Sequence, residues 1–341
     1  MIKPKRIKKG MTAAILSPSW GGPSLYPKIF ENGIKTLREL GFSIKEYPTT
    51  RMTADLLEKN PELRAKDINN AFEDKSVDLI IASIGGEDSI KILPHLDTQK
   101  ILDNPKIIMG YSDTSTILTY LNTLGLVTFH GPCVMSGFSQ ADSLGEEFKK
   151  YVNDFLFGEY QEFQYKPYKF YSNGYPDWND NSNIGKVNEK IENEGWRFLQ
   201  GKGEVKGALF GGCIETLEQI KKSKFWPRDD FWEGKILFFE TSEDKPSPDD
   251  VKKIILGYRN IFDKVSAVLF GRARDYTQDE KDKLDKILVN TIGGNFGNPN
   301  IPIISNMDFG HTDPQFILPL GIQAKLDITK KTFKLIESPF I

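Results

Sequence analysis

Short apolar runs alternate with amphipathic stretches along the first 130 residues of the chain. The runs are rich in Ile, Leu and Val, whereas the stretches between them carry apolar residues at three- and four-residue spacing. The first pattern is typical of buried strands and the second of helices packed on one face. Their alternation predicts a parallel sheet covered by helices on both faces. We expect strands at residues 12–16, 42–47, 77–84, 106–109 and 127–130, and helices at 28–40, 62–72, 88–93 and 114–124.

The pattern changes between about residues 163 and 203, where Tyr, Asn, Asp and Gly are frequent and periodicity is weak. Such a stretch predicts a long connection, so we place the domain boundary within it. The chain of 341 residues is also longer than one hydrophobic core usually spans. We therefore expect a first α/β domain at 1–165, a connecting segment with an active-site loop at 166–206, and a second domain at 207–341.

The second half repeats the alternation of apolar runs and amphipathic stretches, and it ends in an alternating segment that suits a β-hairpin. The predicted strands are 207–210, 235–239, 267–270 and 301–305, the predicted helices are 215–222, 248–260 and 279–289, and the predicted hairpin is 321–336.

Composition excludes several classes of protein. Hydrophobic residues make up 39% of the chain and charged residues 27%, which is the balance of a soluble globular protein. A formal net charge of -2 provides no field to attract a nucleic acid polymer or an anionic membrane. No apolar run approaches the ~20 residues of a membrane helix, and no export signal is visible. We expect a cytoplasmic protein that acts on a small molecule or a peptide.

Cysteine and histidine are scarce. Cys133 and Cys213 are the only cysteines, which leaves no disulfide framework and no paired-cysteine metal motif. Three histidines leave little material for a metal site. His95, at a predicted helix end, is interpreted as a surface residue. His130, which follows a predicted strand, is interpreted as a structural hydrogen-bonding residue.

Ser112 lies in Gly-Tyr-Ser-Asp-Thr-Ser at 110–115, between a predicted strand and a predicted helix. A serine at such a turn exposes its hydroxyl, and the flanking amides at the helix N-terminus can stabilise an oxyanion. The alternative is that Ser112 or Asp113 merely caps the helix. The segment lacks the second glycine of the G-x-S-x-G motif, which argues against an ordinary α/β-hydrolase.

Gly85 and Gly86 follow the preceding predicted strand, where parallel sheets place their ligands. Two glycines permit close approach of the backbone. They could complete an oxyanion hole that faces Ser112, or hold a phosphate at the next helix N-terminus, or form a plain tight turn.

His311 and Glu240 are candidates for a base and its orienting carboxylate. His311 lies in a polar loop after a predicted strand, and its ordinary pKa suits a general base near neutral pH. Glu240 ends the predicted strand 235–239, where a carboxylate could orient an imidazole. Glu243 could do the same, and either residue could be a solvated loop carboxylate.

Taken together, these segments resemble the LD-carboxypeptidase (S66) peptidase family, and within it the microcin C immunity (MccF-like) branch. The resemblance runs over almost the whole chain, and seven segments in the family's order are far more specific than any one of them. The segments are IGG at 84–86, GYSD at 110–113, EGWRF at 194–198, GALFGG at 207–212, ILFFETS at 236–242, FGR at 270–272 and GHTDP at 310–314.

The resemblance implies a flavodoxin-like N-terminal domain and a smaller, β-rich α/β C-terminal domain, with the active site between them. It places Ser112 as the nucleophile, with Glu240 as the acidic residue and His311 as the base. It also implies an oxyanion hole formed by the backbone amides of Gly86 and Asp113. No metal or organic cofactor is needed. Family members commonly form homodimers, so a homodimer is a further expectation.

The resemblance also bears on substrate recognition. Trp196 matches a loop tryptophan that can stack on the nucleobase part of a substrate in MccF-like members, and simple anchoring of the loop is the alternative. Cys213 stands where asparagine is expected after Gly-Gly, which puts any substrate contact there in doubt. A carboxypeptidase needs a cation or amide nest for the terminal carboxylate, and Arg272 and Lys245 are the candidates.

The expected activity is that of a serine carboxypeptidase working through an acyl-enzyme. The substrate would be a peptidyl-nucleotide of the processed microcin C type or a muropeptide with an L–D bond, and the Trp196 segment favours the first. Two alternatives belong to other classes: a nucleotide-phosphate-binding transferase that uses the Gly85–Gly86 turn, and a non-catalytic peptide-binding protein.

Overall fold

The first sheet of the computed structural model, which describes residues 1–341, is a doubly wound parallel sheet of the flavodoxin type. Its strand order is β14-β5-β4-β3-β1-β2, and all neighbours are parallel except β14, which runs antiparallel to β5. The strands are β1 (Thr12–Leu16), β2 (Ser43–Glu46), β3 (Leu79–Ala82), β4 (Ile107–Gly110), β5 (Thr128–His130) and β14 (Leu318–Leu320). The five strands expected in the first half are confirmed, while β14 arrives from the far end of the chain.

The helices that cover this sheet follow the predicted amphipathic stretches. Apolar side chains of α2, such as Ile29, Ile34 and Leu37, are fully buried against the strands. The helical segments of the first half are α1 (Gly22–Leu25), α2 (Pro27–Glu39), η1 (Pro48–Arg51), α3 (Ala54–Lys59), α4 (Pro61–Glu73), η2 (Ser89–His95), α5 (Thr98–Asp103), η3 (Ser112–Thr114), α6 (Ser115–Thr123), α7 (Ala141–Leu144) and α8 (Glu146–Phe157).

The second sheet has eight strands in the order β6-β16-β15-β10-β11-β12-β13-β9. Its central strands β10 to β13 are parallel, and antiparallel strands flank them on both sides. The strands are β6 (Phe163–Tyr165), β9 (Arg197–Gln200), β10 (Glu204–Cys213), β11 (Ile236–Glu240), β12 (Ala267–Gly271), β13 (Ile303–Met307), β15 (Gln323–Asp327) and β16 (Thr332–Leu335). A mixed sheet of this kind agrees with the expected β-rich second half.

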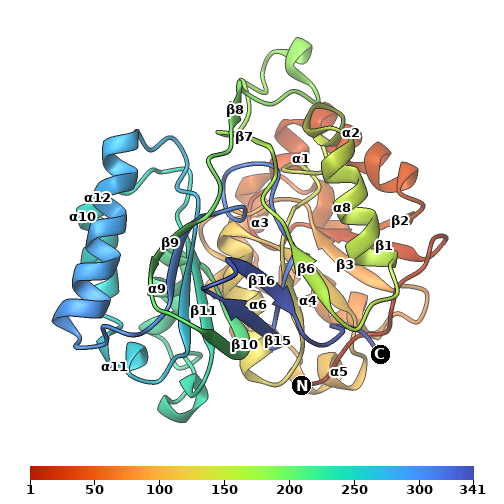
Figure 1. Ribbon diagram of the computed structural model, residues 1–341. Helices are drawn as coiled ribbons and strands as arrows, with labels where there is room; N and C mark the ends of the chain where they lie inside the picture. The colour runs from red at the N-terminus through yellow and green to blue at the C-terminus, as the bar shows by residue number, and fades with distance from the viewer.

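The helices of the second half lie mainly on the outer side of this sheet, where α10 and α12 are seen in Figure 1. The helix expected at 248–260 is interrupted at Gly257, so that two helices replace one. The segments are α9 (Ile214–Lys221), η5 (Asp229–Trp232), α10 (Pro248–Leu256), α11 (Arg259–Phe262), α12 (Gln278–Leu288) and η6 (Val289–Asn295). None of the helices in the structure is both long and apolar enough to span a bilayer.

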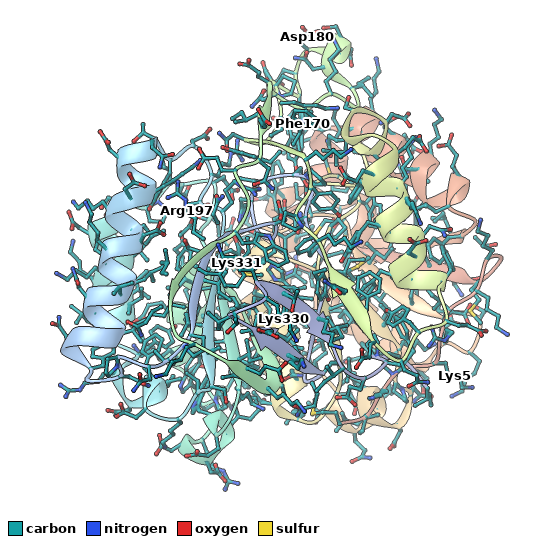
Figure 2. The ribbon with its side chains drawn as sticks, viewed as in Figure 1. Lys5, Phe170, Asp180, Arg197, Lys330 and Lys331 are labelled. Carbon is teal, nitrogen blue, oxygen red and sulfur yellow. The ribbon has the colours of Figure 1, made fainter.

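The stretch at 163–203 contains four short strands that the weak periodicity did not predict. β6 and β9 pair with β16 and β13 of the second sheet, and β7 (Phe170–Ser172) forms a ribbon with β8 (Lys190–Glu192). The partners of β6 and β9 lie more than a hundred residues away, so pairing stabilises strands that have little local signal. The loop between β7 and β8 projects from the molecule, with Asp180 near its tip (Figure 2).

One apolar core of 82 buried residues extends through both sheets. Helix α6 lies between them in Figure 1, and its first residue touches the end of β10, where Ser115 Oγ accepts a hydrogen bond from Cys213 N–H at 3.2 Å. An added Cβ at Gly212 would come within 2.7 Å of Ser115 Oγ. The start of α6 is therefore held firmly against the second sheet, and Ser112 lies at that start.

Candidate active site

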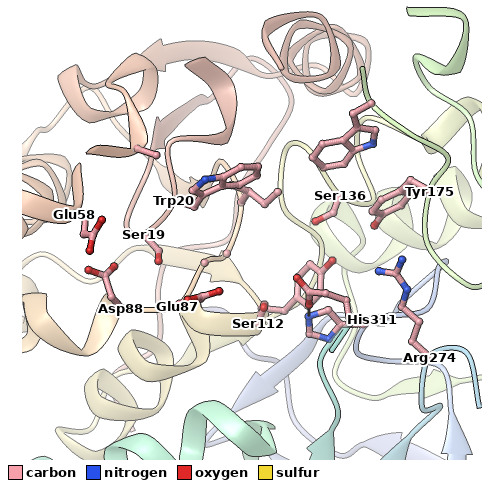
Figure 3. Close-up of a pocket in the computed structure, with 17 residues that line it drawn as sticks. Ser19, Trp20, Glu58, Glu87, Asp88, Ser112, Ser136, Tyr175, Arg274 and His311 are labelled. Atoms are coloured by element: carbon pink, nitrogen blue, oxygen red, sulfur yellow. Dashed lines mark ion pairs between the residues drawn. The ribbon is translucent and has the colours of Figure 1, made fainter. Parts of the chain in front are cut away.

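The carboxyl ends of strands from both sheets meet around one cavity of about 610 Å³. The loops after β3 and β4 of the first sheet provide Gly85, Gly86 and Ser112, and loops of the second half provide Glu243, Arg274 and His311 (Figure 3). Parallel α/β sheets place ligands at this end of their strands. The cavity is therefore the candidate active site.

Ser112 is held in a backbone conformation that side chains rarely adopt. Its φ angle is 57°, in the left-handed region, which costs a non-glycine residue about 1–3 kcal/mol. The strained turn lifts the half-buried side chain out of the sheet end and into the cavity. Gly85 packs directly against it, because an added Cβ would lie 2.8 Å from Ser112 Cβ and 3.0 Å from its Oγ. Strain and close packing together place the hydroxyl.

Two backbone N–H groups beside Ser112 have no acceptor within the chain. These are the N–H groups of Gly86 and Asp113. The two turns that carry them are joined through Ser89, whose N–H donates to Asp113 Oδ2 at 2.8 Å and whose hydroxyl donates to the Asp113 carbonyl at 2.7 Å. Gly86 has a φ of 153°, and an added Cβ would lie 2.2 Å from Ser19 Oγ. Only glycine fits this position.

Glu240 and His311 form a buried hydrogen-bonded pair, with 2.6 Å between Glu240 Oε2 and His311 Nδ1. Two glycines make room for the carboxylate: added Cβ atoms at Gly310 and Gly271 would lie 2.6 Å and 2.9 Å from Glu240 Cβ. Burial raises the pKa of Glu240, although the charge of His311 opposes this. The pair thus fixes the ring orientation and leaves Nε2 as the nitrogen that faces the cavity.

Glu243 occupies the cavity side of the same imidazole. Its Oε2 lies 2.9 Å from His311 Nε2, without the alignment of a hydrogen bond. Burial alone would lower the pKa of His311, but the two carboxylates outweigh it and raise that pKa to about 10. In return, contact with His311 lowers the pKa of Glu243 to about 2, against the effect of burial. The two carboxylates thus favour the protonated form of the imidazole.

Aromatic rings enclose the inner side of His311. The ring of Tyr111 packs against it with centroids 4.9 Å apart, and His130 lies behind Tyr111 at 6.1 Å. The predicted hydrogen-bonding role of His130 is wrong, since neither ring nitrogen has a partner and the ring packs on Phe238. Burial lowers the pKa of His130 to about 3, so this histidine stays neutral. His95 is on the surface, as expected.

Trp196 is not among the residues that line the cavity, contrary to the substrate contact expected for it. Its indole N–H donates to the buried Asp308 at 2.8 Å, and its ring packs edge-on against Phe316 and Phe333. A buried carboxylate that needs a donor thus holds the indole inside the fold. These contacts agree with the alternative to nucleobase stacking, in which Trp196 anchors its loop.

The two cations considered for a terminal carboxylate also lie outside the cavity lining. Arg272 is fully buried, donates to Asp308 at 2.8 Å and stacks over Tyr171, while Lys245 pairs with Glu280 at 3.2 Å. The lining contains Arg274 instead, two residues beyond Arg272.

Sequence reasoning also missed the aromatic lining of the cavity. Trp178 stacks on Tyr175 with ring centroids 5.7 Å apart, and its edge meets Tyr26 at 5.4 Å. Trp20 lies across the cavity from Tyr175 in Figure 3. Trp178 and Tyr175 belong to the stretch of weak periodicity, where concentrated aromatic residues in a polar segment were the one available signal.

Family models identify the two halves of the chain. The model described as the LD-carboxypeptidase N-terminal domain matches residues 13–131, and the model of the LD-carboxypeptidase C-terminal domain matches residues 206–326. The chain belongs to the LD-carboxypeptidase (peptidase S66) family. It is therefore placed among carboxypeptidase hydrolases.

Relatives within the LD-carboxypeptidase family include MccF proteins. The chain is 30% identical to the microcin C7 self-immunity protein MccF of Escherichia coli, over 90% of this chain and 88% of the relative. A structure of MccF in complex with aspartyl sulfamoyl adenosine superposes with a TM-score of 0.87 at 26% identity, over the full length of both chains. An MccF-like protein from Streptococcus pneumoniae in complex with AMP gives a TM-score of 0.84 at 29% identity, over 96% of this chain and 98% of the other.

Proposed function

We propose that this LD-carboxypeptidase family member is a serine peptidase in which Ser112 is the nucleophile, His311 the general base and Glu240 the residue that orients it. The observation that carries the proposal is the convergence at one cavity of a strained serine and a buried Glu240–His311 pair. A nucleophile, a base and a carboxylate that orients the base are the three groups of a Ser-His-Asp/Glu acyl-transfer site.

The reaction would begin with transfer of the Ser112 hydroxyl proton to His311 Nε2 as Oγ bonds to the substrate carbonyl carbon. The free N–H groups of Gly86 and Asp113 would donate to the oxyanion of the tetrahedral intermediate. His311 then gives its proton to the leaving nitrogen, and the C–N bond breaks. Water, deprotonated by His311, releases the acid from Ser112 and restores the hydroxyl.

For the substrate, we favour a peptidyl-nucleotide over a muropeptide. Solved MccF and MccF-like proteins are described in complex with aspartyl sulfamoyl adenosine and with AMP. In this chain, Trp178 and Tyr175 present aromatic surface to the cavity, on which a nucleobase can stack. We therefore assign the stacking role to Trp178, in place of Trp196. Cleavage of a C-terminal D-residue from a muropeptide is the second candidate, because the family models are named for that activity.

A phosphate-binding transferase fits the cavity less well. Glu87 and Asp88 follow the Gly85–Gly86 turn and line the cavity. The nearby Arg64 is fully buried and donates to Asp88 at 2.6 Å and to the Pro18 carbonyl at 3.1 Å. The turn thus presents carboxylates to a ligand, which repel phosphate.

Mass spectrometry of two substrates tests the proposal. Wild type, Ser112→Ala and the control variant Ser223→Ala, whose side chain is outside the cavity lining, would each be incubated with a murein tetrapeptide ending in D-Ala and with an aminoacyl sulfamoyl adenosine. We expect wild type and Ser223→Ala to release the nucleotide and Ser112→Ala to release nothing. Release of D-Ala alone would establish the second candidate. Turnover by Ser112→Ala at the wild-type rate would refute the assignment of the nucleophile, and stable binding without hydrolysis by wild type would indicate a binding protein.

A further inference from the structure

Arg274 is the only lysine or arginine among the residues that line the cavity. Carboxylates dominate the rest of the charged lining, at Glu58, Glu87, Asp88 and Glu243. The guanidinium donates from Nε to Asp275 at 3.3 Å, and its two Nη atoms donate no hydrogen bond within the chain. Four N–H bonds of a permanent cation are therefore available to a ligand in an otherwise acidic cavity.

The position of this guanidinium is determined by the fold. Arg274 follows the carboxyl end of β12, and its side chain is 23% exposed. It lies against the bare backbone of Gly174, where an added Cβ would come within 2.5 Å of Arg274 Cζ and Nη2. In Figure 3 it lies on the side of His311 opposite Ser112. A planar donor held in this way suits a planar or tetrahedral anion.

Glu243 blocks the catalytic nitrogen in the same region. His311 Nε2 must accept the Ser112 proton, yet Glu243 Oε2 lies 2.9 Å from it. The half-exposed Glu243 has no lysine or arginine within ion-pair distance, so His311 is its only charged contact. Arg274 helps to keep Glu243 ionised. An anion that reaches Arg274 therefore meets a carboxylate that it repels.

We propose that Arg274 binds the anionic group next to the scissile amide of the substrate, and that this anion displaces Glu243 from His311 Nε2. The inference rests on the proposed function, because it concerns the substrate of that site. A peptide ending in a D-residue carries its carboxylate two bonds from the amide nitrogen. An acyl sulfamate or acyl phosphoramidate carries its anionic group directly on that nitrogen. Both sources share the chemistry of an anion on the leaving-group side.

This arrangement makes the substrate complete the active site. With no anion present, Glu243 occupies the side of His311 Nε2 at which the Ser112 proton must arrive and favours the imidazolium, a form that cannot accept a proton. Once Glu243 leaves, Nε2 faces Ser112 and the base function is restored. Neutral amide compounds would leave Glu243 in place and be cut slowly, which gives the enzyme its preference for chain ends.

Paired substrates test the role of Arg274. The rate constant kcat/KM would be measured for a tetrapeptide ending in D-Ala and for the same peptide ending in D-alaninamide, and for an aminoacyl sulfamoyl adenosine. Wild type should prefer the carboxylate over the carboxamide by about 100-fold or more, as charge recognition in a partly buried site allows. Arg274→Gln should lose that preference mainly through KM, and Arg274→Lys should regain part of it. Lys245→Gln, a cation outside the cavity, should behave as wild type.

Glu243→Gln tests the displacement step. This variant lacks the negative charge of Glu243 beside His311 Nε2. Turnover of the carboxamide should therefore rise several-fold, whereas turnover of the carboxylate should change little. The imidazole resonances of His311, followed by NMR in the Ser112→Ala protein, should shift on addition of the D-Ala peptide and remain unshifted with the carboxamide. Equal loss of both substrates in Arg274→Gln, or an unchanged carboxamide rate in Glu243→Gln, would overturn the inference.

Binding measurements distinguish a failure of the Arg274 anion site from a failure of the proposed peptidase function. Affinity of Ser112→Ala for the D-Ala peptide and for the sulfamoyl adenosine, measured by calorimetry with and without Arg274→Gln, needs no turnover. If wild type cuts neither compound but binds one through Arg274, the proposed function fails and the anion site stands. If neither compound depends on Arg274 for binding, the anion site fails whatever the enzyme hydrolyses.

Discussion

Glu240 and His311 are 71 residues apart in the chain, yet their carboxylate and imidazole meet at 2.6 Å in the buried floor of the cavity. Glu240 is the last residue of β11 and His311 follows β13 in the second sheet, and glycines at 271 and 310 provide the space that the carboxylate fills. The pair leaves His311 Nε2 on the side of the ring that Glu243 contacts, and both His311 and Ser112 line the cavity.

Replacing Glu240 with glutamine should reduce kcat on the order of 10⁴-fold while KM changes little, because the amide favours the wrong imidazole tautomer and cannot stabilise the imidazolium. Steady-state kinetics on the active substrate, with far-ultraviolet circular dichroism to verify folding, would measure this. Glu204→Gln, an exposed carboxylate paired with Lys325, is the matched control and should keep full activity. A loss below tenfold in Glu240→Gln would contradict the assigned role.

Stability should fall as pH rises from about 6.5 towards about 10. The folded pKa of His311 is raised to about 10 from an ordinary value of 6.5, so its contribution is complete below 6.5 and is lost as pH passes through the folded value. The groups that face His311 are Glu240 and Glu243, with Asp313, Tyr111 and the neutral His130 further away. Urea unfolding followed by tryptophan fluorescence at pH 6.5, 8 and 10 would measure the slope.

His311→Asn is the comparison for this pH effect. The free energy of unfolding of this variant should depend less on pH above 6.5, because asparagine has no imidazole to take up a proton on folding. Glu243→Gln should lie between it and wild type, since one of the two carboxylates that raise the pKa remains. Identical slopes for wild type and His311→Asn would show that His311 is not a cation in the free protein.

Gly85→Ala should impair catalysis far more than folding. The new Cβ would lie 2.8 Å from Ser112 Cβ, so the hydroxyl must move, and a displacement near 1 Å costs on the order of 100-fold in kcat. Gly294→Ala is the control, because nothing lies within 4 Å of an added Cβ there. Kinetics and thermal melts of both variants would be compared. Wild-type kcat in Gly85→Ala would show that the packing of this glycine does not position the serine.

Trp178→Ala and Trp196→Ala should separate substrate binding from packing. Loss of a stacked base costs about 1–3 kcal/mol, so Trp178→Ala should raise KM for a nucleotide-bearing substrate roughly 10- to 100-fold and leave a muropeptide unaffected. Trp196→Ala should instead lower the melting temperature, because it removes a hydrogen bond to Asp308 and contacts with Phe316 and Phe333. If Trp196→Ala instead raised KM for the nucleotide-bearing substrate and Trp178→Ala only lowered the melting temperature, the stacking role would belong to Trp196.

The sequence by itself predicted the elements whose signals are local. Apolar periodicity located the five parallel strands of the first sheet, and the Gly-Tyr-Ser-Asp turn located Ser112 between a strand and a helix. Turn residues and side-chain periodicity act over a few residues, so the pattern of neighbours is enough to specify them. Similarity to the LD-carboxypeptidase family then supplied the roles expected for Glu240 and His311.

Only the tertiary structure decided which of several similar side chains reaches the cavity. Arg272 and Arg274 are two residues apart, yet the first is buried on Asp308 and the second faces the cavity. Trp178 and Trp196 share one polar stretch, but only Trp178 lines the site. β6 and β9 likewise depend on partners from distant parts of the chain. These outcomes follow from long-range packing and from the need of buried charges for partners, which no local pattern of residues encodes.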